Sequence, residues 1–253
     1  MSKTPANTTS KAKTGAVSTP QAVLFDAYGT LFDVYSVALL AEQLFPGQGQ
    51  ALSLLWRDKQ IEYTRLVTTC NDGAHYRPFW ELTRAALTFA IKKLAPSTAS
   101  TGASAEFDTK VEQLMNQYRS LSAFPENREV LQALQAQGVP TGILSNGDVA
   151  MLTLALKSSG LHPYVGHIIS VDAVKKYKTH PAAYALGEST LGLAASQILF
   201  VSSNGWDALG ATWYGYQTLW VNRSGQPFEE LGTQPTRTGM SLRDVLGFFP
   251  VSL

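Results

Sequence analysis

Cysteine is nearly absent from this chain, since Cys70 is the only one among 253 residues. A disulfide within the chain is therefore impossible, and no cysteine-based metal site can form. Apolar runs of the roughly 20 residues that a membrane span needs are missing as well. Residues 1–20 are rich in Ser, Thr, Ala and Lys and lack the apolar core of a secretory signal, so we expect a disordered tail there. We expect a cytoplasmic protein, because a reducing compartment suits a chain with a single thiol.

A surplus of charge of either sign is missing too. The chain carries 20 Lys and Arg against 19 Asp and Glu, which leaves a formal net charge of +1. This balance gives no electrostatic reason to expect nucleic acid or an anionic membrane as a partner. The apolar fraction of 45% is enough for a sizeable core, and the length fits one α/β domain or a core with an inserted smaller domain.

Motifs for nucleotide cofactors and histidine pairs for metals are also lacking. No G-x-G-x-x-G follows the first apolar run, and no G-x-x-x-x-G-K-S/T occurs in the chain. The histidines, His75, His162, His167 and His180, have no spacing typical of a metal-binding pair, and we interpret them as structural or surface residues. The sequence thus predicts neither a cofactor nor a metal.

Short apolar runs, by contrast, are present and predict a parallel sheet. Buried parallel strands read as continuous hydrophobic segments, and helical segments of suitable length lie between the later ones. Strands that alternate with helices form right-handed βαβ units. The sequence therefore predicts an α/β fold with a doubly wound, five-stranded, Rossmann-like parallel sheet. The expected strands are Ala22–Phe25, Thr141–Leu144, His167–Ser170, Ile198–Val201 and Thr218–Val221.

The first connection is far longer than one crossover helix requires. About 115 residues separate Phe25 from Thr141, and apolar residues recur there at helical spacing, for example over residues 52–66. The economical interpretation is an inserted helical cap, within which the low-complexity residues 95–105 predict a mobile loop. The expected division is a core domain of residues 21–35 and 123–253 and a cap domain of residues 36–122.

Polar residues follow three of the expected strands. Asp26 comes directly after the first strand, and Ser145 comes after the second. Ser202, Asn204 and Asp207 come after the fourth. An Asp or Ser at a strand end is often only a helix N-cap. In open parallel sheets, however, ligands bind beyond the carboxyl ends of the strands, so polar groups from three strands indicate a site.

Four segments resemble the ordered motifs of the haloacid dehalogenase superfamily. They are FDAYGTLFDVYS (25–36), ILSNG (143–147), YKTHPAAY (177–184) and FVSSNGWD (200–207). Within that superfamily the chain is most similar to the L-2-haloacid dehalogenases, hydrolytic enzymes that invert configuration. The resemblance implies hydrolysis of (S)-2-haloalkanoic acids to (R)-2-hydroxyalkanoic acids and halide, and it implies a homodimer.

Tyr28 distinguishes two chemistries within the superfamily. The phosphatases have D-x-D in the first motif, and this chain has Tyr28 in place of the second Asp. Their fourth motif supplies an acidic ligand where this chain has Ser202-Ser203-Asn204, so Mg²⁺ would lack its usual hard oxygen ligands. Two alternatives stay open at this point: a Mg-dependent phosphatase or phosphonatase, and a non-catalytic protein that binds a small carboxylate.

The resemblance also implies catalytic roles. Asp26 would displace halide from C2 and form an aspartyl ester. Lys178 would keep Asp26 ionised, and Thr30 would fix its rotamer. Asp207 would activate the water that cleaves the ester. The other catalytic residues expected from the resemblance are Arg57, Ser145, Ser202, Asn204 and Tyr184.

A second group is expected to bind the substrate and the halide. A helix arginine is usually a solvated surface charge, but Arg57 lies in WRDKQIEYTRL, which resembles the segment that carries the family's halide-binding arginine. Ser145 resembles the residue that binds the substrate carboxylate. The remaining members expected in this group are Tyr28, Asn146 and Trp206. Two positions depart from the family pattern: Asp58 stands in place of a glutamine and Thr179 in place of a proline.

We predict that activity on 2-haloacids needs no metal, because the positions that would supply acidic ligands lack carboxylates. Protein treated exhaustively with EDTA should release halide at the same rate as untreated protein. A strict requirement for Mg²⁺ would instead favour the phosphatase interpretation.

Overall fold

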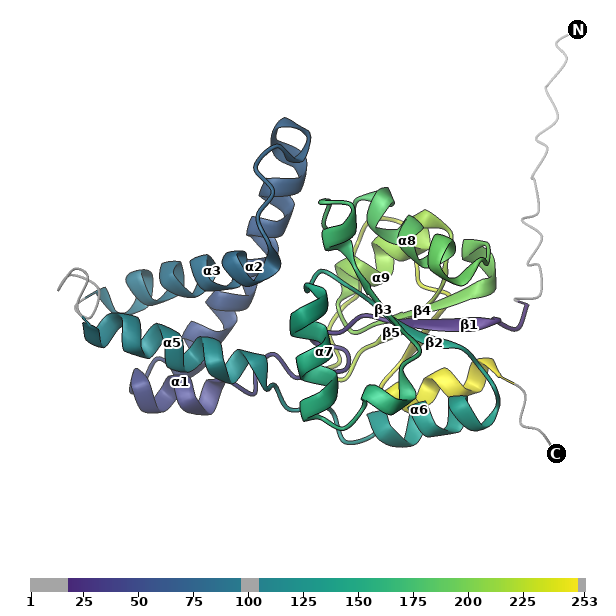
Figure 1. Cartoon of the computed structure of the whole chain (residues 1–253), viewed down its shortest axis with the longest axis horizontal. Coiled ribbons are helices and arrows are strands. Elements are labelled where there is room, and N and C mark those ends of the chain that lie inside the picture. Colours follow the sequence, from purple (N-terminus) through teal and green to yellow (C-terminus); the bar gives the residue numbers. More distant parts are fainter. Residues whose placement is uncertain (1–17, 97–104, 250–253) are drawn as a thin grey trace, which may run out of the picture.

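The computed structural model describes residues 18–96 and 105–249. The tail expected over residues 1–20 and the loop expected over residues 95–105 lie mostly outside these ranges. Among the described residues, no helix is long and apolar enough to cross a membrane. The described chain forms a parallel sheet with helices on both faces and a separate group of helices at one end (Figure 1).

Six parallel strands form the sheet, in the order β3-β2-β1-β4-β5-β6. β1 lies between β2 and β4, with Phe25 opposite Ile143 on one side and Val201 on the other. The chain builds outward from β1 in both directions, which leaves a switch point between β1 and β4 where such sheets bind ligands. The strands are β1 (Ala22–Phe25), β2 (Thr141–Ser145), β3 (His167–Ser170), β4 (Ile198–Ser202), β5 (Gln217–Val221) and β6 (Arg237–Gly239).

Helices cover both faces of the sheet, which explains why its central strands are largely apolar. α8 and α9 lie above the sheet in Figure 1, and α6 lies below it. Every residue of β1, β2, β4 and β5 is buried between these layers. The helices of this part are α6 (Asn127–Ala136), α7 (Val149–Ser158), α8 (Pro181–Leu191) and α9 (Gly205–Tyr214), with the 3-10 helices η3 (Val171–Ala173) and η5 (Leu242–Phe248).

The α/β class predicted from the sequence is confirmed, and the sheet has one strand more than the five expected. The extra strand, β6, has the sequence RTG and lies exposed at the edge of the sheet. No apolar run marks such a strand, because an edge strand of three residues buries little surface. The expected strands agree with the structure to within one residue, since β2 and β4 extend to Ser145 and Ser202 and β5 begins at Gln217.

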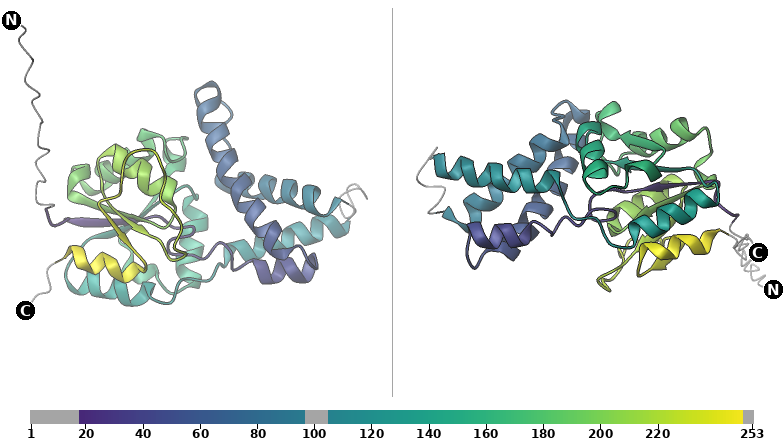
Figure 2. Two further views of the ribbon diagram at one scale, coloured as in Figure 1. Left: turned by 180° about the vertical axis from the view of Figure 1, so that it is seen from behind. Right: turned by 60° about the horizontal axis from the view of Figure 1, so that its bottom comes forward.

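In the described parts of the long first connection, four α-helices gather beside the sheet (Figure 2). α2 and α3 pack against each other through buried residues such as Leu52 and Leu87, and the indole N–H of Trp56 donates to the Thr83 carbonyl at 2.8 Å. The C-terminal end of α2 contacts the part of the molecule that contains the sheet. The helices are α1 (Ala38–Leu44), α2 (Gly49–Thr69), α3 (Phe79–Leu94) and α5 (Ala105–Arg119), and the 3-10 helix η1 (Cys70–Gly73) follows α2.

We predict that Gly187→Ala destabilises the fold, although alanine is the better helix former by about 0.5–1 kcal/mol. A Cβ at Gly187 would lie 2.5 Å from Leu24 Cδ1 and would also meet the Tyr216 hydroxyl. Overpacking of this kind typically costs about 1–3 kcal/mol, so the net effect should be unfavourable. Urea unfolding measures it. Gly247→Ala is the control, because the only contact of its Cβ is with Arg237 Nη1 at 3.5 Å. A Gly187→Ala protein as stable as the wild type would contradict this account of α8 packing.

Candidate active site

Polar side chains from three neighbouring strands meet at one edge of the sheet. Asp26 follows β1, Ser145 ends β2 and Ser202 ends β4. Because β2 and β4 flank β1 and all three run parallel, their carboxyl ends lie side by side. α9 begins at the same edge and carries Asp207 in its first turn.

The Asp26 carboxylate is nearly buried and has three donors. Thr30 Oγ1 donates to Oδ2 at 3.0 Å, and Asn204 Nδ2 donates to the same oxygen at 2.8 Å. Lys178 Nζ donates to Oδ1 at 3.2 Å. One oxygen is thus anchored by two hydrogen bonds, while the other faces the ammonium group.

Lys178 lies between two carboxylates in the interior. Its Nζ is 3.2 Å from Asp26 Oδ1 and 3.0 Å from Asp207 Oδ2, and its side chain has no exposed surface. The ammonium also lies 4.7 Å from the centre of the Phe200 ring, and the backbone N–H donates to Asn146 Oδ1 at 3.0 Å. Burying an unpaired ion costs several kcal/mol of folding free energy. The Lys178 ammonium is paired with two carboxylates, which offset this cost.

Asp207 is completely buried and has its own set of donors. Tyr184 donates its hydroxyl to Oδ1 at 2.8 Å, and Ser202 donates to Oδ2 at 3.1 Å. Burial raises the pKa of the Asp207 carboxyl to about 6; the Lys178 ammonium opposes this rise, and the Asp26 carboxylate adds to it. A carboxyl with that pKa can accept a proton near neutral pH, as a general base must.

Asn204 connects the nucleophile candidate to the helices beside the sheet. Its Nδ2 donates to Asp26 and also to the Tyr28 carbonyl at 3.0 Å. Its backbone N–H donates to Ser202 Oγ at 3.1 Å. Its Oδ1 accepts from Arg57 Nη2 at 3.1 Å, so one side chain bridges the sheet edge and α2.

Arg57 reaches the sheet edge from α2. Its Nη2 donates to the Tyr28 carbonyl at 3.0 Å, and its Nη1 donates to Gln60 Oε1 at 2.7 Å. Gln60 is buried and donates in turn to Thr83 Oγ1 at 2.7 Å and to the Tyr118 hydroxyl at 3.2 Å. Gln60 was not predicted from the sequence. Its position one helical turn after Arg57, at a spacing that lets two side chains meet, could have indicated it.

A small cavity lies between the strand ends and the helices. Its volume is about 10 Å³, which is room for about one water molecule. α2 and α3 contribute Arg57, Ile61 and Phe79, of which Ile61 and Phe79 were not expected from the sequence. The lining residues are Asp26, Tyr28, Arg57, Ile61, Phe79, Ser145, Asn146 and Trp206.

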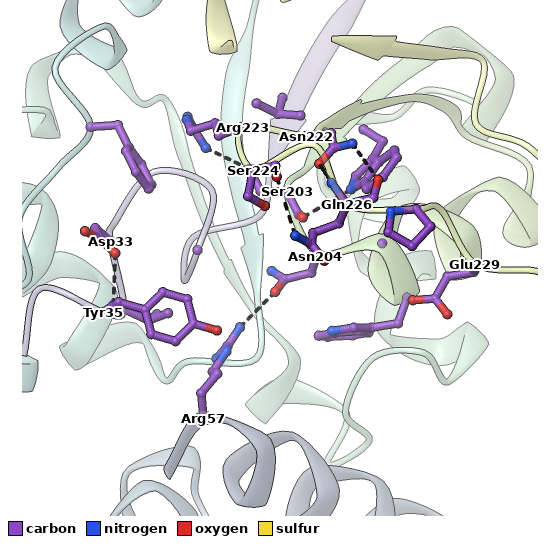
Figure 3. A pocket seen from close by; sticks show the side chains of 18 residues that line it. Asp33, Tyr35, Arg57, Ser203, Asn204, Asn222, Arg223, Ser224, Gln226 and Glu229 are labelled. Carbon is purple, nitrogen blue, oxygen red and sulfur yellow. Dashed lines mark hydrogen bonds between the residues drawn. The ribbon is translucent and has the colours of Figure 1, made fainter. Parts of the chain in front are cut away.

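A larger cavity of about 440 Å³ adjoins the small one. Figure 3 shows Arg57 pointing into it from α2 toward Asn204, with Glu229 at the far side. Arg57 and Trp206 line both cavities. These two side chains therefore form the boundary between the small cavity and the larger, more open one.

The other expected residues fall into different places. Ser145 and Asn146 line the small cavity, and Ser145 Oγ accepts from the Gly147 N–H at 3.1 Å. Trp206 lines it too, with the Arg65 guanidinium 5.4 Å from its ring centre. Tyr184 contacts Asp207 and does not line the cavity.

The Tyr28 ring is held by aromatic packing. It stacks on Tyr118 with ring centres 5.6 Å apart and an interplanar angle of 21°, and it packs on Phe79 at 5.5 Å. Burial raises the pKa of Tyr28 well above its usual value, and the nearby Tyr118, Asp148 and Asp26 raise it further. Tyr28 therefore stays neutral and shapes the cavity wall.

In the described part of the chain, no group of three or more His, Cys, Asp or Glu side chains is placed to hold a metal ion. The two carboxylates of the site, Asp26 and Asp207, share the Lys178 ammonium. Their charge is thus met by a side chain of the protein itself.

A family model described as haloacid dehalogenase-like hydrolase matches residues 20–215. The chain belongs to the haloacid dehalogenase-like hydrolase family. The matched range includes all of the sheet-edge residues described above. The family expected from the four sequence motifs is therefore confirmed.

Individual relatives are similar over nearly their whole length. Haloacetate dehalogenase H-2 of Moraxella sp. (strain B) is 42% identical, over 86% of this chain and 92% of that enzyme. The solved L-2-haloacid dehalogenase RSc1362 is 52% identical, with a TM-score of 0.85 over 91% of this chain and 99% of that one. A structure of L-2-haloacid dehalogenase from Xanthobacter autotrophicus with chloropropionic acid covalently bound is 32% identical, with a TM-score of 0.79 over 89% and 96%.

Proposed function

We propose that the chain hydrolyses (S)-2-haloalkanoic acids to (R)-2-hydroxyalkanoic acids and halide, through an ester on Asp26. The observation that carries the proposal is that Asp26 and Arg57 line the same small cavity. Displacement at C2 needs a carboxylate nucleophile and a cation that stabilises the departing halide. The likeness to enzymes named as haloacetate and L-2-haloacid dehalogenases supports this substrate class.

In the first step, Asp26 attacks C2 from behind the carbon–halogen bond. A C–O bond forms, and halide leaves with the electron pair of the broken bond. Oδ1 is suited to the attack, because Thr30 and Asn204 already hold Oδ2 while Oδ1 faces Lys178 alone among the described side chains. Such alignment can be worth about 7–11 kcal/mol. The related structure with covalently bound chloropropionic acid supports the ester.

The substrate carboxylate and the departing halide meet different groups of the protein. Arg57 polarises the departing halide, with Asn146 and Trp206 beside it, and the position of Arg57 in the cavity wall supports this role. The substrate carboxylate is bound by Ser145 and by backbone N–H groups near the start of α7, where the helix dipole favours an anion. Tyr28 closes the wall.

In the second step, water attacks the carbonyl carbon of the ester. Asp207 accepts a proton from this water, and its raised pKa supports the assignment. The acyl–oxygen bond breaks, the departing oxygen takes the proton back from Asp207, and the 2-hydroxy acid leaves with the oxygen that Asp26 gave in the first step. Asp26 then loses its own proton to solvent and is a carboxylate again. Because C2 is not attacked again, its inverted configuration is kept.

The wider organisation belongs to the same proposal. The helices of residues 36–122 form a cap domain over the core of residues 21–35 and 123–253. The small cavity has room for about one water, so the cap must move to admit a haloacid. We further propose a homodimer in the cytoplasm, on the strength of the family resemblance and the single cysteine.

No observation favours the two alternatives considered for the sequence. A phosphatase of this superfamily uses a second Asp at the position of Tyr28, and the ring of Tyr28 is instead packed against Tyr118. A protein that only bound carboxylates would gain nothing from Asp207, a second acid buried beside the first. The dehalogenase proposal uses both features.

We predict that the purified protein releases chloride from (S)-2-chloropropionate and forms (R)-lactate. Asp26→Asn should lower turnover by at least about 1,000-fold, because the nucleophile is removed, while the fold is kept, since Lys178 retains Asp207 as its ion partner. Ion chromatography and chiral analysis of the product measure this. Undiminished chloride release by Asp26→Asn would contradict the proposed nucleophile.

The proposed ester on Asp26 leads to a separate prediction about isotope transfer. A single turnover in ¹⁸O-water, with enzyme in excess, should give unlabelled hydroxy acid and one ¹⁸O in the peptide that contains Asp26. Mass spectrometry of the product and of the peptide measures both. Labelled product with an unlabelled peptide would show direct attack of water on C2.

Asp207 gives the second step a pH dependence. It must be ionised to accept the proton of water, so ester cleavage should speed up as pH rises through the Asp207 pKa and then level off. That pKa is about 6 in the free enzyme, and esterification removes the Asp26 charge that raises it, so the midpoint should lie at or below about 6.

Asp207→Asn should still release one equivalent of halide per site, but it should cleave the ester at least about 100-fold more slowly and without this pH dependence. Rapid-quench mass spectrometry follows the ester directly. An Asp207→Asn protein that cleaves the ester as fast as the wild type would show that Asp207 is not the base.

A further inference from the structure

Arg223 lies just beyond β5 and has no role in the site as described so far. Its guanidinium points back toward the sheet edge, as Figure 3 shows. Nη1 donates to Ser203 Oγ at 2.8 Å, and Nη2 donates to the Thr30 carbonyl at 3.2 Å. Nε and Nη2 both donate to Glu126 Oε1, at 3.2 and 2.9 Å. One side chain therefore joins segments that follow β1 and β4 to the start of α6.

The plane of this guanidinium is fixed from two sides. Glu126 immediately precedes α6, its side chain is only 9% exposed, and it holds the guanidinium edge. The guanidinium carbon lies 3.8 Å from the centre of the Phe124 ring, which holds the face. A planar group with several donors in a rigid fork can serve three acceptors at once, which a lysine ammonium on a flexible stem cannot do in the same geometry.

The two segments that Arg223 joins are the ones that hold Asp26. Thr30 Oγ1 donates to Asp26 Oδ2 and accepts from the Ser203 N–H at 2.8 Å. Asn204 follows Ser203 directly and donates to the same Asp26 oxygen. Thr30 and Asn204, which both donate to Oδ2, therefore lie in segments that Arg223 holds in place. Arg223 itself does not contact Asp26.

We propose that Arg223 is a positioning residue that sets the aim of the Asp26 carboxylate by clamping the Thr30 and Ser203-Asn204 segments together. The inference rests on the proposed function of Asp26 as nucleophile. Displacement is sensitive to alignment, and a misplacement of about 1 Å by a distant change can cost about 100-fold in rate. The clamp thus acts on the first chemical step and leaves substrate binding largely intact.

The decisive variants are Arg223→Met and Glu126→Gln, with Arg243→Met as the matched control. Arg243 makes the same kind of paired contact with Glu129 one turn further along α6, at 3.1 and 2.7 Å, but on the exposed surface. Arg223→Met should slow single-turnover halide release by about 10- to 100-fold, with KM changed by less than about threefold. Glu126→Gln keeps an oxygen acceptor and should cost less than Arg223→Met. Arg243→Met should match the wild type.

A readout that is independent of activity separates this inference from the proposed function. Hydrogen exchange at the amides of residues 26–31 and 200–204 should be about tenfold faster in Arg223→Met than in Arg243→Met, because the clamp is lost. Wild-type protein that releases no halide from any 2-haloacid would refute the proposed function, and the exchange measurement would still test the clamp. Unchanged exchange, or equal slowing of halide release in Arg223→Met and Arg243→Met, would overturn the positioning role.

Discussion

The buried ammonium group of Lys178 holds together the polar side chains at the carboxyl end of the sheet. Lys178 Nζ lies within 3.2 Å of Asp26 and 3.0 Å of Asp207, in an interior that screens charge poorly. Removing one partner from a buried ion pair typically costs about 3–5 kcal/mol, because the charge left behind has no compensation. Because they share the Lys178 cation, the two acids can lie close together, but their other neighbours give them different environments. Asp26 is an anchored carboxylate beside the cavity, and Asp207 is a fully buried acid with a raised pKa.

The helices beside the sheet take part in this arrangement. Tyr177, which precedes Lys178, donates its N–H to Thr68 Oγ1 of α2 at 3.1 Å and its hydroxyl to the Arg77 carbonyl at 2.6 Å. The segment that presents the ammonium to the carboxylates is thereby fastened to the helical part. Arg57 comes from the same helix, α2, and bonds to Asn204. The docked helices therefore bring Arg57 to Asn204 and also secure the segment that carries Lys178.

Elements defined by local pattern could be predicted, and those defined by distant neighbours could not. The central strands are continuous apolar runs because both faces of the sheet are covered, so their positions are visible in the sequence. β6 is polar and exists only because β5 offers it an edge. Arg223 looks like an ordinary polar surface residue, because its partners are far away in sequence; the Thr30 carbonyl, for example, is 193 residues from it.

By itself, the sequence determined the chemistry that is available. It put Asp26 at a strand end, placed Tyr28 where a second acid would serve a metal, and supplied three lysines in VKKYK. The family resemblance pointed to Lys178, but only the tertiary structure decided the surroundings that distinguish the three lysines. Lys175 pairs with Asp172 and is 55% exposed, Lys176 pairs with Asp72 and is 17% exposed, and Lys178 alone of the three has no exposed surface. The physical reason is that a side chain's identity is local, whereas its desolvation and its ion partners depend on atoms that folding brings from 152 residues away.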